Sequence, residues 1–579
     1  MYDTIIRGGT LVDGTGRPGF NADLAMSGDS IVKIGDLAEC EAARTLDATH
    51  RVVSPGFIDI HSHTEQTILL FPGAQSCVAQ GITTCIGGNC GLSPAPLAAH
   101  YTSCNWWDWN WWEKVAPTKY YQEILGDIDD VRKASMEVDG VDIDWKSLAE
   151  FLERVENSRP AVNLGVLVGH GTIRTAVMGR DWRRGASAEE IRLMKWYAAR
   201  AMEEGALGIS NGLDYAPNNY SCSNESYEVI AEAVKKGGWF ASHWRRRDLR
   251  PPTGKPVLAD GLREAIDIAE KAGARLQVSH LSAAYSVWPA PTERLSALIA
   301  EETLAMIDEA ASQGIEISFD CIPSDGGGFY GKYMASMLTP WLKVSGSLEQ
   351  LAINLRRPEV QDDIREYITS GKWFYLNPVT NPGWAHSVRI IESDCAEYVG
   401  RTLHEISLEQ NSSALDTLMH LITRDPRIRS ASSGSSYLTK RIFFSHPKAM
   451  PGVDAITCDL GWEVRVPPYL LPDPGAFGGM ATFIRKYGQT TLGIEETVHK
   501  MTGLPASVAG LSDRGVLAPG YKADVVVFSP EEVSETGDYV EPRRYPRGFE
   551  WVFVNGEAVV SESTLTGCRP GHVLRRACT

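Results

Sequence analysis

Apolar residues recur through the middle of the chain in short runs, and most of these runs end in a polar side chain. Helical patterns separate several of the runs: Ser187-Ala188-Glu189-Glu190 forms a capping box, and Gly205 stands where a helix C-terminal cap belongs. The eight runs end at His63, Cys90, His170, Asn211, His243, His280, Asp320 and Asp454. Strands that alternate with helices predict a parallel α/β architecture, and eight of them predict a (β/α)8 barrel.

Both ends of the chain show a different pattern, of short strands joined by turns. The expected strands are 4–7, 11–12, 23–26 and 30–34 near the start, and 523–528, 551–554 and 557–560 near the end. Because each small β segment alone would leave unpaired edges, we expect the two ends to pair into one β-sandwich. The predicted domains are therefore a sandwich from 1–54 and 515–579 and a barrel from 55–514, with insertions near 100–140 and 321–445.

Composition restricts the partners of the protein. The 579 residues carry a formal net charge of −17, which argues against nucleic acid or an anionic membrane surface and favours a small-molecule substrate. No apolar run reaches the ~18 residues of a membrane helix, and the start lacks the pattern of a signal peptide. The 11 scattered cysteines suit a reduced compartment, so we expect a cytoplasmic protein. The sequence leaves a homo-oligomer open.

His61 and His63 end the apolar run that begins at Gly56. Alternate residues of a strand point to the same side, so both imidazoles would be available to one divalent metal. The endings at Cys90, His170, His243, His280 and Asp454 would reach the same face, because the carboxyl ends of barrel strands form the active site. The pattern therefore predicts a buried metal site.

A tryptophan-rich segment at 105–112 contains five of the sixteen tryptophans. It follows the strand that ends at Cys90, so it belongs to a loop on the active-site face. One interpretation is that the rings pack the loop down or contact a subunit partner. The other is that Trp106 and Trp109 form an aromatic wall for an apolar substrate. The nearby stretch 126–131 is interpreted as solvated and acidic rather than as a second metal site.

Several motifs resemble the amidohydrolase superfamily, and within it the D-aminoacylase (N-acyl-D-amino-acid deacylase) branch. The resemblance covers nearly the whole chain. It rests on the segments 55–63, 88–91, 167–174, 205–210, 278–280, 517–524 and 554–556. The most specific of these is Gly88-Asn89-Cys90-Gly91, because most binuclear relatives bridge their metals with a carboxylated lysine, whereas the D-aminoacylase branch uses a cysteine.

The resemblance implies a ligand set of His61, His63, Cys90, His243, His280 and Asp454. The first two histidines and Asp454 would bind one metal, the other two histidines would bind the second, and Cys90 would bridge or bind the tighter site as a thiolate. Zinc suits such a mixture of nitrogen, sulfur and oxygen ligands. One zinc site is tight in that branch and the other weak, so one or two metals are expected. His170 has no ligand counterpart; a substrate contact and a core histidine both stay open.

The catalytic acid must be chosen between Asp454 and Asp459. The family register after His446-Pro447 favours Asp454, with Val453 in the usual place of a serine. Beside a metal that polarises the carbonyl and activates a water, Asp454 would accept a proton and pass it to the leaving nitrogen. The expected reaction is hydrolysis of an amide or cyclic amide. A metal-dependent lyase, decarboxylase or isomerase on the same fold is the alternative.

The substrate site departs from the family pattern. D-aminoacylases hold the substrate carboxylate with a lysine, a tyrosine and an arginine. Here Ser282 and Gly475 replace the two cations, and 320–324 lacks the tyrosine. We therefore expect neutral aromatic or cyclic amides to be better substrates than N-acyl-D-amino acids. In the rival interpretation Arg246, just after His243, rebuilds the clamp, and the protein is a plain N-acyl-D-amino-acid deacylase.

Overall fold

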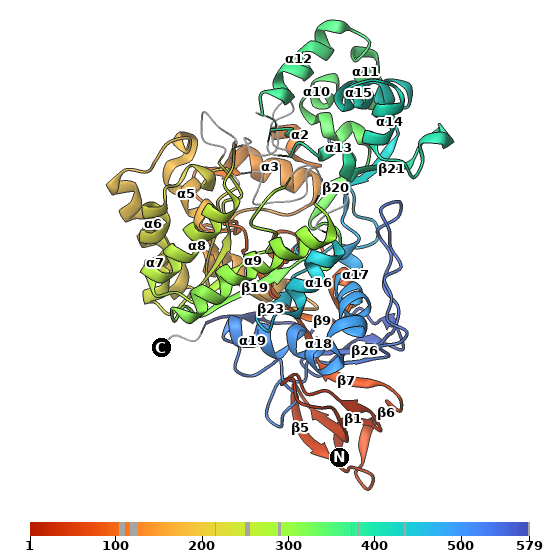
Figure 1. The fold of residues 1–579 in the computed structure, drawn as a ribbon. Coiled ribbons are helices and arrows are strands. Elements are labelled where there is room, and N and C mark those ends of the chain that lie inside the picture. The colour runs from red at the N-terminus through yellow and green to blue at the C-terminus, as the bar shows by residue number, and fades with distance from the viewer. Residues whose placement is uncertain are drawn as a thin grey trace.

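A computed structural model gives the fold of the chain (Figure 1). The residues that it describes are 1–102, 110–115, 125–214, 216–248, 255–287, 291–371, 373, 376–379, 381–432 and 436–576. Among these residues, no helix combines the length and the apolar character needed to cross a membrane.

The two ends of the chain meet in a pair of sheets. One sheet has the order β5-β4-β1-β6 and contains β1 (Tyr2–Arg7), β4 (Asp23–Ser27), β5 (Ser30–Gly35) and β6 (Ala42–Asp47). The other has the order β28-β27-β26-β25-β7-β2-β3. Its strands are β2 (Thr10–Leu11), β3 (Phe20–Asn21), β7 (Val52–Pro55), β25 (Val525–Phe528), β26 (Phe549–Val554), β27 (Glu557–Ser561) and β28 (Thr564–Leu565). β7 pairs antiparallel with β25, so early and late segments share one sheet.

Alternating side chains explain why the two terminal sheets lie together. Ile6 and Leu24 from the first sheet and Val525, Val527 and Phe553 from the second belong to one buried apolar cluster. Period-2 alternation places such residues on one face of each sheet, and burying both faces stabilises the pair.

Eight successive strand segments form the central parallel structure, and all eight expected runs contain one. They are β8 (Phe57–Asp59), β9 (Ile82–Gly87), β12 and β13 (Asn163–Val166 and Val168–Gly169), β14 (Gly208–Gly212), β15 (Trp239–His243), β18 (Leu276–Val278), β19 (Ile317–Cys321) and β23 (Ala449–Pro451). Their ladders are parallel. The last and first strands approach each other just beyond their ends, where Asp454 N donates to His61 O at 2.8 Å and His63 N to Ala455 O at 2.9 Å. β29 (Val573–Leu574) pairs with β12.

Helices between these strands cover the central structure. They include α4 (Leu148–Ser158), α5 (His170–Met178), α6 (Ala188–Glu203), α7 (Ser223–Lys235), α8 (Leu258–Ala272), α9 (Glu293–Ser312) and α16 (Tyr437–Ser445), followed by α17 (Gly475–Phe483), α18 (Ile494–Met501) and α19 (Gly503–Ala509). α6 begins with the expected capping box, in which Ser187 Oγ accepts from Glu190 N at 3.3 Å and Glu190 Oε2 accepts from Ser187 N at 2.7 Å. Gly205 follows the helix with φ +111°, a conformation that glycine adopts readily.

A mostly helical insertion lies between β19 and β23 and projects from the main body (Figure 1). Its elements are α10 (Thr339–Ser345), α11 (Leu348–Asn354), α12 (Pro358–Thr369), α13 (Trp384–Ser387), β21 (Val388–Glu392), α14 (Leu403–Glu409), α15 (Ala414–Arg424) and β22 (Arg429–Ser432). It has a hydrophobic cluster of its own, which includes Leu342, Leu351 and Leu418. A short antiparallel pair of strands, β20 (Phe329–Gly331) with β24 (Leu470–Pro472), lies at its base.

A smaller insertion follows β9 and contains β10 (His100–Thr102), α2 (Trp112–Val115), β11 (Leu125–Asp127) and α3 (Ile128–Val138). Trp111 and Trp112 are fully buried and stack on each other, with ring centroids 4.6 Å apart. These two rings therefore pack the segment down. Trp106 and Trp109 lie outside the described residues. Asp129 and Asp130 are exposed in the first turn of α3, as expected for a solvated acidic stretch.

The side chain of Asn163, at the start of β12, joins the central strands to the end of the chain. Its amide donates to Thr83 O at 3.2 Å and to Asp524 Oδ2 at 3.1 Å. Its oxygen accepts from Asn555 Nδ2 at 2.8 Å and from His572 N at 3.1 Å. The contacts with Thr83, Asp524 and Asn555 are buried between the central structure and the terminal strands, and the one with His572 is partly buried.

Replacing Asn163 by alanine should lower the free energy of unfolding by about 2–4 kcal/mol, because several buried polar partners would lose their hydrogen bonds together. Urea denaturation would measure the change. Asn381 is exposed, and Asn381→Ala as a control should change stability by no more than about 0.5 kcal/mol. Equal effects of the two substitutions would contradict the assigned role of Asn163.

Candidate metal centre

Six side chains that can bind a metal converge at the carboxyl ends of the central strands. Within the described residues they form two groups that share Cys90, and in each group the donor atoms lie within 4.8 Å of one another. The groups are His61, His63, Cys90 and Asp454, and Cys90, His243 and His280. All are buried except Asp454, which is half-buried. The structure therefore brings together every ligand that the resemblance implied.

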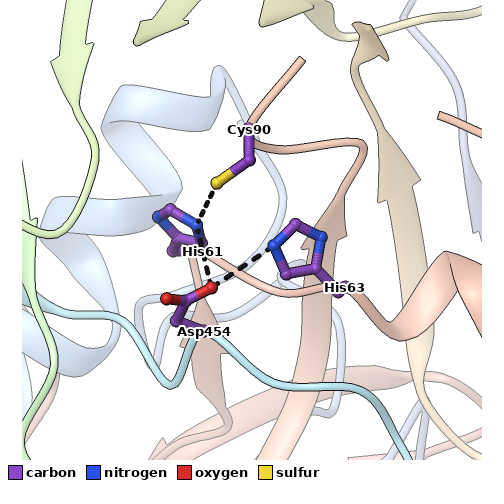
Figure 2. A group of neighbouring side chains, drawn as sticks. All are labelled: His61, His63, Cys90 and Asp454. Carbon is purple, nitrogen blue, oxygen red and sulfur yellow. Dashed lines mark hydrogen bonds and ion pairs between the residues drawn. The ribbon is translucent and has the colours of Figure 1, made fainter. Parts of the chain in front are cut away.

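Figure 2 shows the first group, in which nitrogen, sulfur and oxygen donors face one point. Cys90 Sγ lies 3.3 Å from His61 Nε2, and Asp454 Oδ1 lies 3.4 Å from His61 Nε2 and 3.3 Å from His63 Nε2. Tetrahedral ligands with metal bonds of about 2.0–2.3 Å are about 3.3–3.7 Å from each other. The spacing of these donors therefore fits a metal ion.

The second group has the same spacing around the shared sulfur. Cys90 Sγ lies 3.5 Å from His243 Nδ1 and 3.7 Å from His280 Nε2. A soft thiolate with two imidazoles is a donor set that suits zinc. Because Cys90 belongs to both groups, its position is that of a bridging ligand.

Three of the six ligands have a left-handed backbone. The φ angles are +57° at Cys90, +35° at His280 and +52° at Asp454. Residues other than glycine rarely adopt such angles, and those that do are concentrated at functional sites. Each of the three lies just beyond a strand, where this turn of the backbone brings the side chain to the common centre.

Buried carboxylates orient the imidazoles from outside the centre. Asp320 Oδ1 lies 3.1 Å from His61 Nδ1, and its other oxygen accepts from His280 N at 2.9 Å. Asp214 Oδ2 lies 3.3 Å from His243 Nε2. In each case the carboxylate takes one ring nitrogen and leaves the other for a metal. Both acids lie at or just after a strand end, but no motif in the sequence predicts this role for either of them.

Arg246 lies at the edge of the centre and is bound to the same carboxylate. Its Nε donates to Asp214 Oδ2 at 2.9 Å, and its Nη2 is 2.8 Å from His243 Nε2. Burial raises the pKa of Asp214, but Arg246 and His243 lower it more, so the pKa lies well below the usual range. Arg246 therefore helps to keep Asp214, the carboxylate that orients His243, ionised.

The centre also favours the ionised forms of its acidic donors. Burial raises the pKa of the Cys90 thiol, but His61 and His243 lower it by more, so the pKa lies well below its ordinary value. Asp454 behaves in the same way: burial raises its pKa, and His61 and His63 lower it more. Burial lowers the pKa values of His61 and His63, but their acidic partners raise them more, to well above the usual range, so a metal would have to displace the protons of these imidazoles while the thiolate and carboxylate are already ionised.

His170 belongs to a different, fully buried network. Its Nδ1 lies 2.9 Å from Asn218 Nδ2, and its Nε2 lies 3.4 Å from Glu225 Oε1. Glu225 also pairs with buried Arg174. Burial raises the pKa of Glu225, but His170 and Arg174 lower it to about 2. These contacts favour the core-histidine interpretation.

The remaining predicted residues have the following positions. Ser282 is half-buried two residues beyond His280. Asp459 Oδ1 accepts from Gly461 N at 2.8 Å in a turn, whereas the donor group contains Asp454. A Cβ at Gly475, the expected arginine position, would collide with Ser324 Oγ, so a larger residue there would require the serine side chain to move.

Comparisons with known proteins agree with this geometry. No family model matches the chain. A D-aminoacylase from Alcaligenes xylosoxydans xylosoxydans is 31% identical over 584 residues, covering 99% of this chain and 98% of that protein. The crystal structure of a D-aminoacylase superposes with a TM-score of 0.70 at 28% identity, over 100% of both chains. The N-acyl-D-glutamate deacylase of Bordetella bronchiseptica, solved with zinc and a phosphonate inhibitor, has a TM-score of 0.69 at 26% identity, over 99% of this chain and 100% of that one.

Cys90→Ala should remove tightly bound metal, because it deletes the anionic donor that both groups share. Removing a residue that only hydrogen-bonds to a metal ligand typically lowers metal affinity by ~10–100-fold. Because Cys90 would bind the metal directly, we expect a larger loss. Elemental analysis of the purified protein measures the metal content directly. Cys85, buried 3.9 Å from Cys77 Sγ, is the matched control, and Cys85→Ala should keep the metal. Full metal content in Cys90→Ala would sink the assignment.

Proposed function

Because the chain belongs to the D-aminoacylase branch of the amidohydrolases, which hydrolyse carbon–nitrogen bonds other than peptide bonds, we propose that it hydrolyses an amide or cyclic amide. The observation that carries the proposal is the complete buried donor set around Cys90. Eight strands closed into a (β/α)8 barrel are part of the same proposal. The backbone bonds of His61 and His63 to the segment after β23 support that closure.

Zinc is the metal that we propose for the centre. The group of Cys90, His243 and His280 would hold the tighter site, and His61, His63 and Asp454 the weaker one, with Cys90 between them. When bound, the metal would polarise the scissile carbonyl and lower the pKa of the attacking water towards ~7.

Asp454 is the residue that would move the proton. Its Oδ1 faces the two histidines of the first group, and its Oδ2 lies beside Gly327, where an added Cβ would be 2.8 Å away. A carboxylate fixed in this way can accept a proton from water and return it to the departing nitrogen. The peptide of Gly328 also donates to Asp454 O at 2.5 Å, which holds the backbone of the acid in place.

The substrate that we propose does not depend on a carboxylate for recognition. Ser282 and Gly475 supply no positive charge, and the guanidinium of Arg246 is bound to Asp214. A buried substrate carboxylate without a cationic partner would cost several kcal/mol. Aromatic or cyclic amides therefore fit the site better than simple N-acyl-D-amino acids.

Asp454→Asn should lower kcat by roughly 10²-fold or more, the usual scale for loss of a general base, while the metal of the Cys90, His243 and His280 group is retained. Steady-state kinetics with parallel elemental analysis would check this. Asp459→Asn is the control, and it should keep normal turnover. The opposite result for the two variants would show that the register of the catalytic acid is wrong by five residues.

Incorporation of labelled solvent oxygen into the product would separate hydrolysis from lyase, decarboxylase or isomerase chemistry.

Neutral aromatic or cyclic amides should have values of kcat/KM at least about tenfold above those of N-acetyl-D-methionine and N-acetyl-D-leucine, a difference of ~1.4 kcal/mol. A substrate panel on the zinc-loaded enzyme would measure this. Efficient turnover of the N-acetyl-D-amino acids, lost in Arg246→Ala without loss of zinc, would instead establish a rebuilt clamp and a plain deacylase.

A further inference from the structure

A cavity of about 220 Å³ lies where the helical insertion meets the main body. Its lining combines two carboxylates with four aromatic rings: Asp325, Phe329, Tyr330, Tyr333, Asp473 and Tyr539. No lysine, arginine or histidine is among the lining residues that the structure describes. Carboxylates and aromatic faces are the groups that recognise an organic cation.

Asp473 is the buried acid of this cavity. Its side chain is 2% exposed, its Oδ1 accepts from Gly475 N at 2.8 Å, and its Oδ2 accepts from Tyr539 Oη at 3.0 Å. Burial raises its pKa above the ordinary value, because these neutral donors do not fully replace the lost hydration of the carboxylate. A cation in the cavity would stabilise the ionised form. Asp325, by contrast, is exposed at the rim.

The basic side chains nearby are paired with other groups of the protein: the Lys332 ammonium pairs with Glu463 at 2.9 Å and lies 5.8 Å from the centroid of the Tyr333 ring. The ammonium of Lys440, on α16, donates to Ser324 O. It does not line the cavity, but its charge offsets part of the negative charge of Asp325 and Asp473. Arg429 donates to the backbone oxygens of Tyr539 and Val540 and pairs with Glu392 at 3.0 Å. The space itself is therefore lined by acids and rings.

One glycine loop lies next to both this cavity and the metal centre. Gly326 and Gly327 both line the cavity. An added Cβ on Gly326 would lie 2.9 Å from Asp473 Oδ2, and one on Gly327 would lie 2.8 Å from Asp454 Oδ2. The acid of the cavity and the proposed proton carrier thus approach consecutive residues of the same loop.

We propose that this cavity binds a positively charged ammonium or guanidinium group on the amine portion of the substrate. The inference rests on the proposed amide hydrolysis, in which Asp454 returns a proton to the leaving nitrogen. Because the cavity wall contacts Asp454, the amine portion of the substrate extends towards Asp473 and Asp325. The inference narrows the proposed substrates, which need no carboxylate, to acylated amines that carry a second, cationic group.

Three acetamides of matched length test the charge preference on the zinc-loaded enzyme: N-acetyl-1,5-diaminopentane, N-acetylhexylamine and N-acetyl-6-aminohexanoate. The expected order of kcat/KM is cation, then neutral amide, then anion. Asp473→Asn should lower the ratio of cation to neutral amide by about 10–100-fold, the scale of a charge-assisted hydrogen bond in a buried site. Asp325→Asn, at an exposed position where charges are screened, should lower it by about two- to fivefold.

Two controls guard these variants. Asp267→Asn makes the same change of charge at an exposed position on α8 and should leave the ratio as it is in the unmodified enzyme. Thermal unfolding shows whether the Asp473→Asn variant is folded. If it is not, the ratio of kcat/KM for the cationic and neutral amides in Asp325→Asn alone tests the proposal. Turnover of the neutral amide without a cation preference, or a ratio that neither Asp473→Asn nor Asp325→Asn lowers, overturns the cavity assignment and leaves amide hydrolysis standing.

Calorimetric titration with 1,5-diaminopentane separates the cavity from the reaction. The zinc-loaded enzyme should bind this diamine, and Asp473→Asn should weaken the binding by about tenfold or more. If neither the three acetamides nor the aromatic and cyclic amides are hydrolysed but the diamine binds in this Asp473-dependent way, the proposed function fails and the cation site stands. Absence of diamine binding overturns the cation site.

Discussion

The sulfur of Cys90 stands between two groups of buried donors, and the rest of the structure serves that arrangement. Removing imidazoles, a carboxylate and a thiolate from water is costly unless each finds a partner. The spacing of 3.3–3.7 Å between the sulfur and one ring nitrogen each of His61, His243 and His280 is what a metal ion between them would impose. A protein without a metal would gain little from placing these groups so close together, so the metal is the partner that makes the burial favourable.

Three layers of structure keep the donors in place. The parallel strands bring their ends to one face, and the positive φ angles at Cys90, His280 and Asp454 turn those side chains inwards. Asp320 and Asp214 then fix which nitrogen of His61 and His243 points to the centre. The proposed substrate side is built differently, from loops and from the base of the helical insertion. In this proposal the strands hold the chemical groups and the loops give selectivity, a division common in enzymes with strand-end active sites.

Much of this could be predicted from the sequence because the signals were local. Apolar runs that end in His61, Cys90 or His243 mark both a strand and a candidate ligand, and family membership follows from the same motifs. What could not be predicted depends on distant contacts. The pairing of Asp320 with His61 joins residues 259 positions apart, and no local pattern identifies it. His170 ends a strand as the candidate ligands do, yet its contacts with Asn218 and Glu225 place it in another network. The cavity acids Asp325 and Asp473 come together only through folding of the whole insertion.

The shared terminal sheet also constrains how the protein can be made. In the pairing of β7 with β25, Val52 lies opposite Phe528, so the partner of a strand formed early in synthesis appears only after almost the whole chain has been translated. Until then the edge of β7 is unpaired, and such an edge is a site for misassociation with other nascent chains. Closing a loop of this length carries an entropic cost and slows non-local pairing. During biosynthesis the sheet that contains β7 therefore cannot be completed until the long segment between β7 and β25 has been translated.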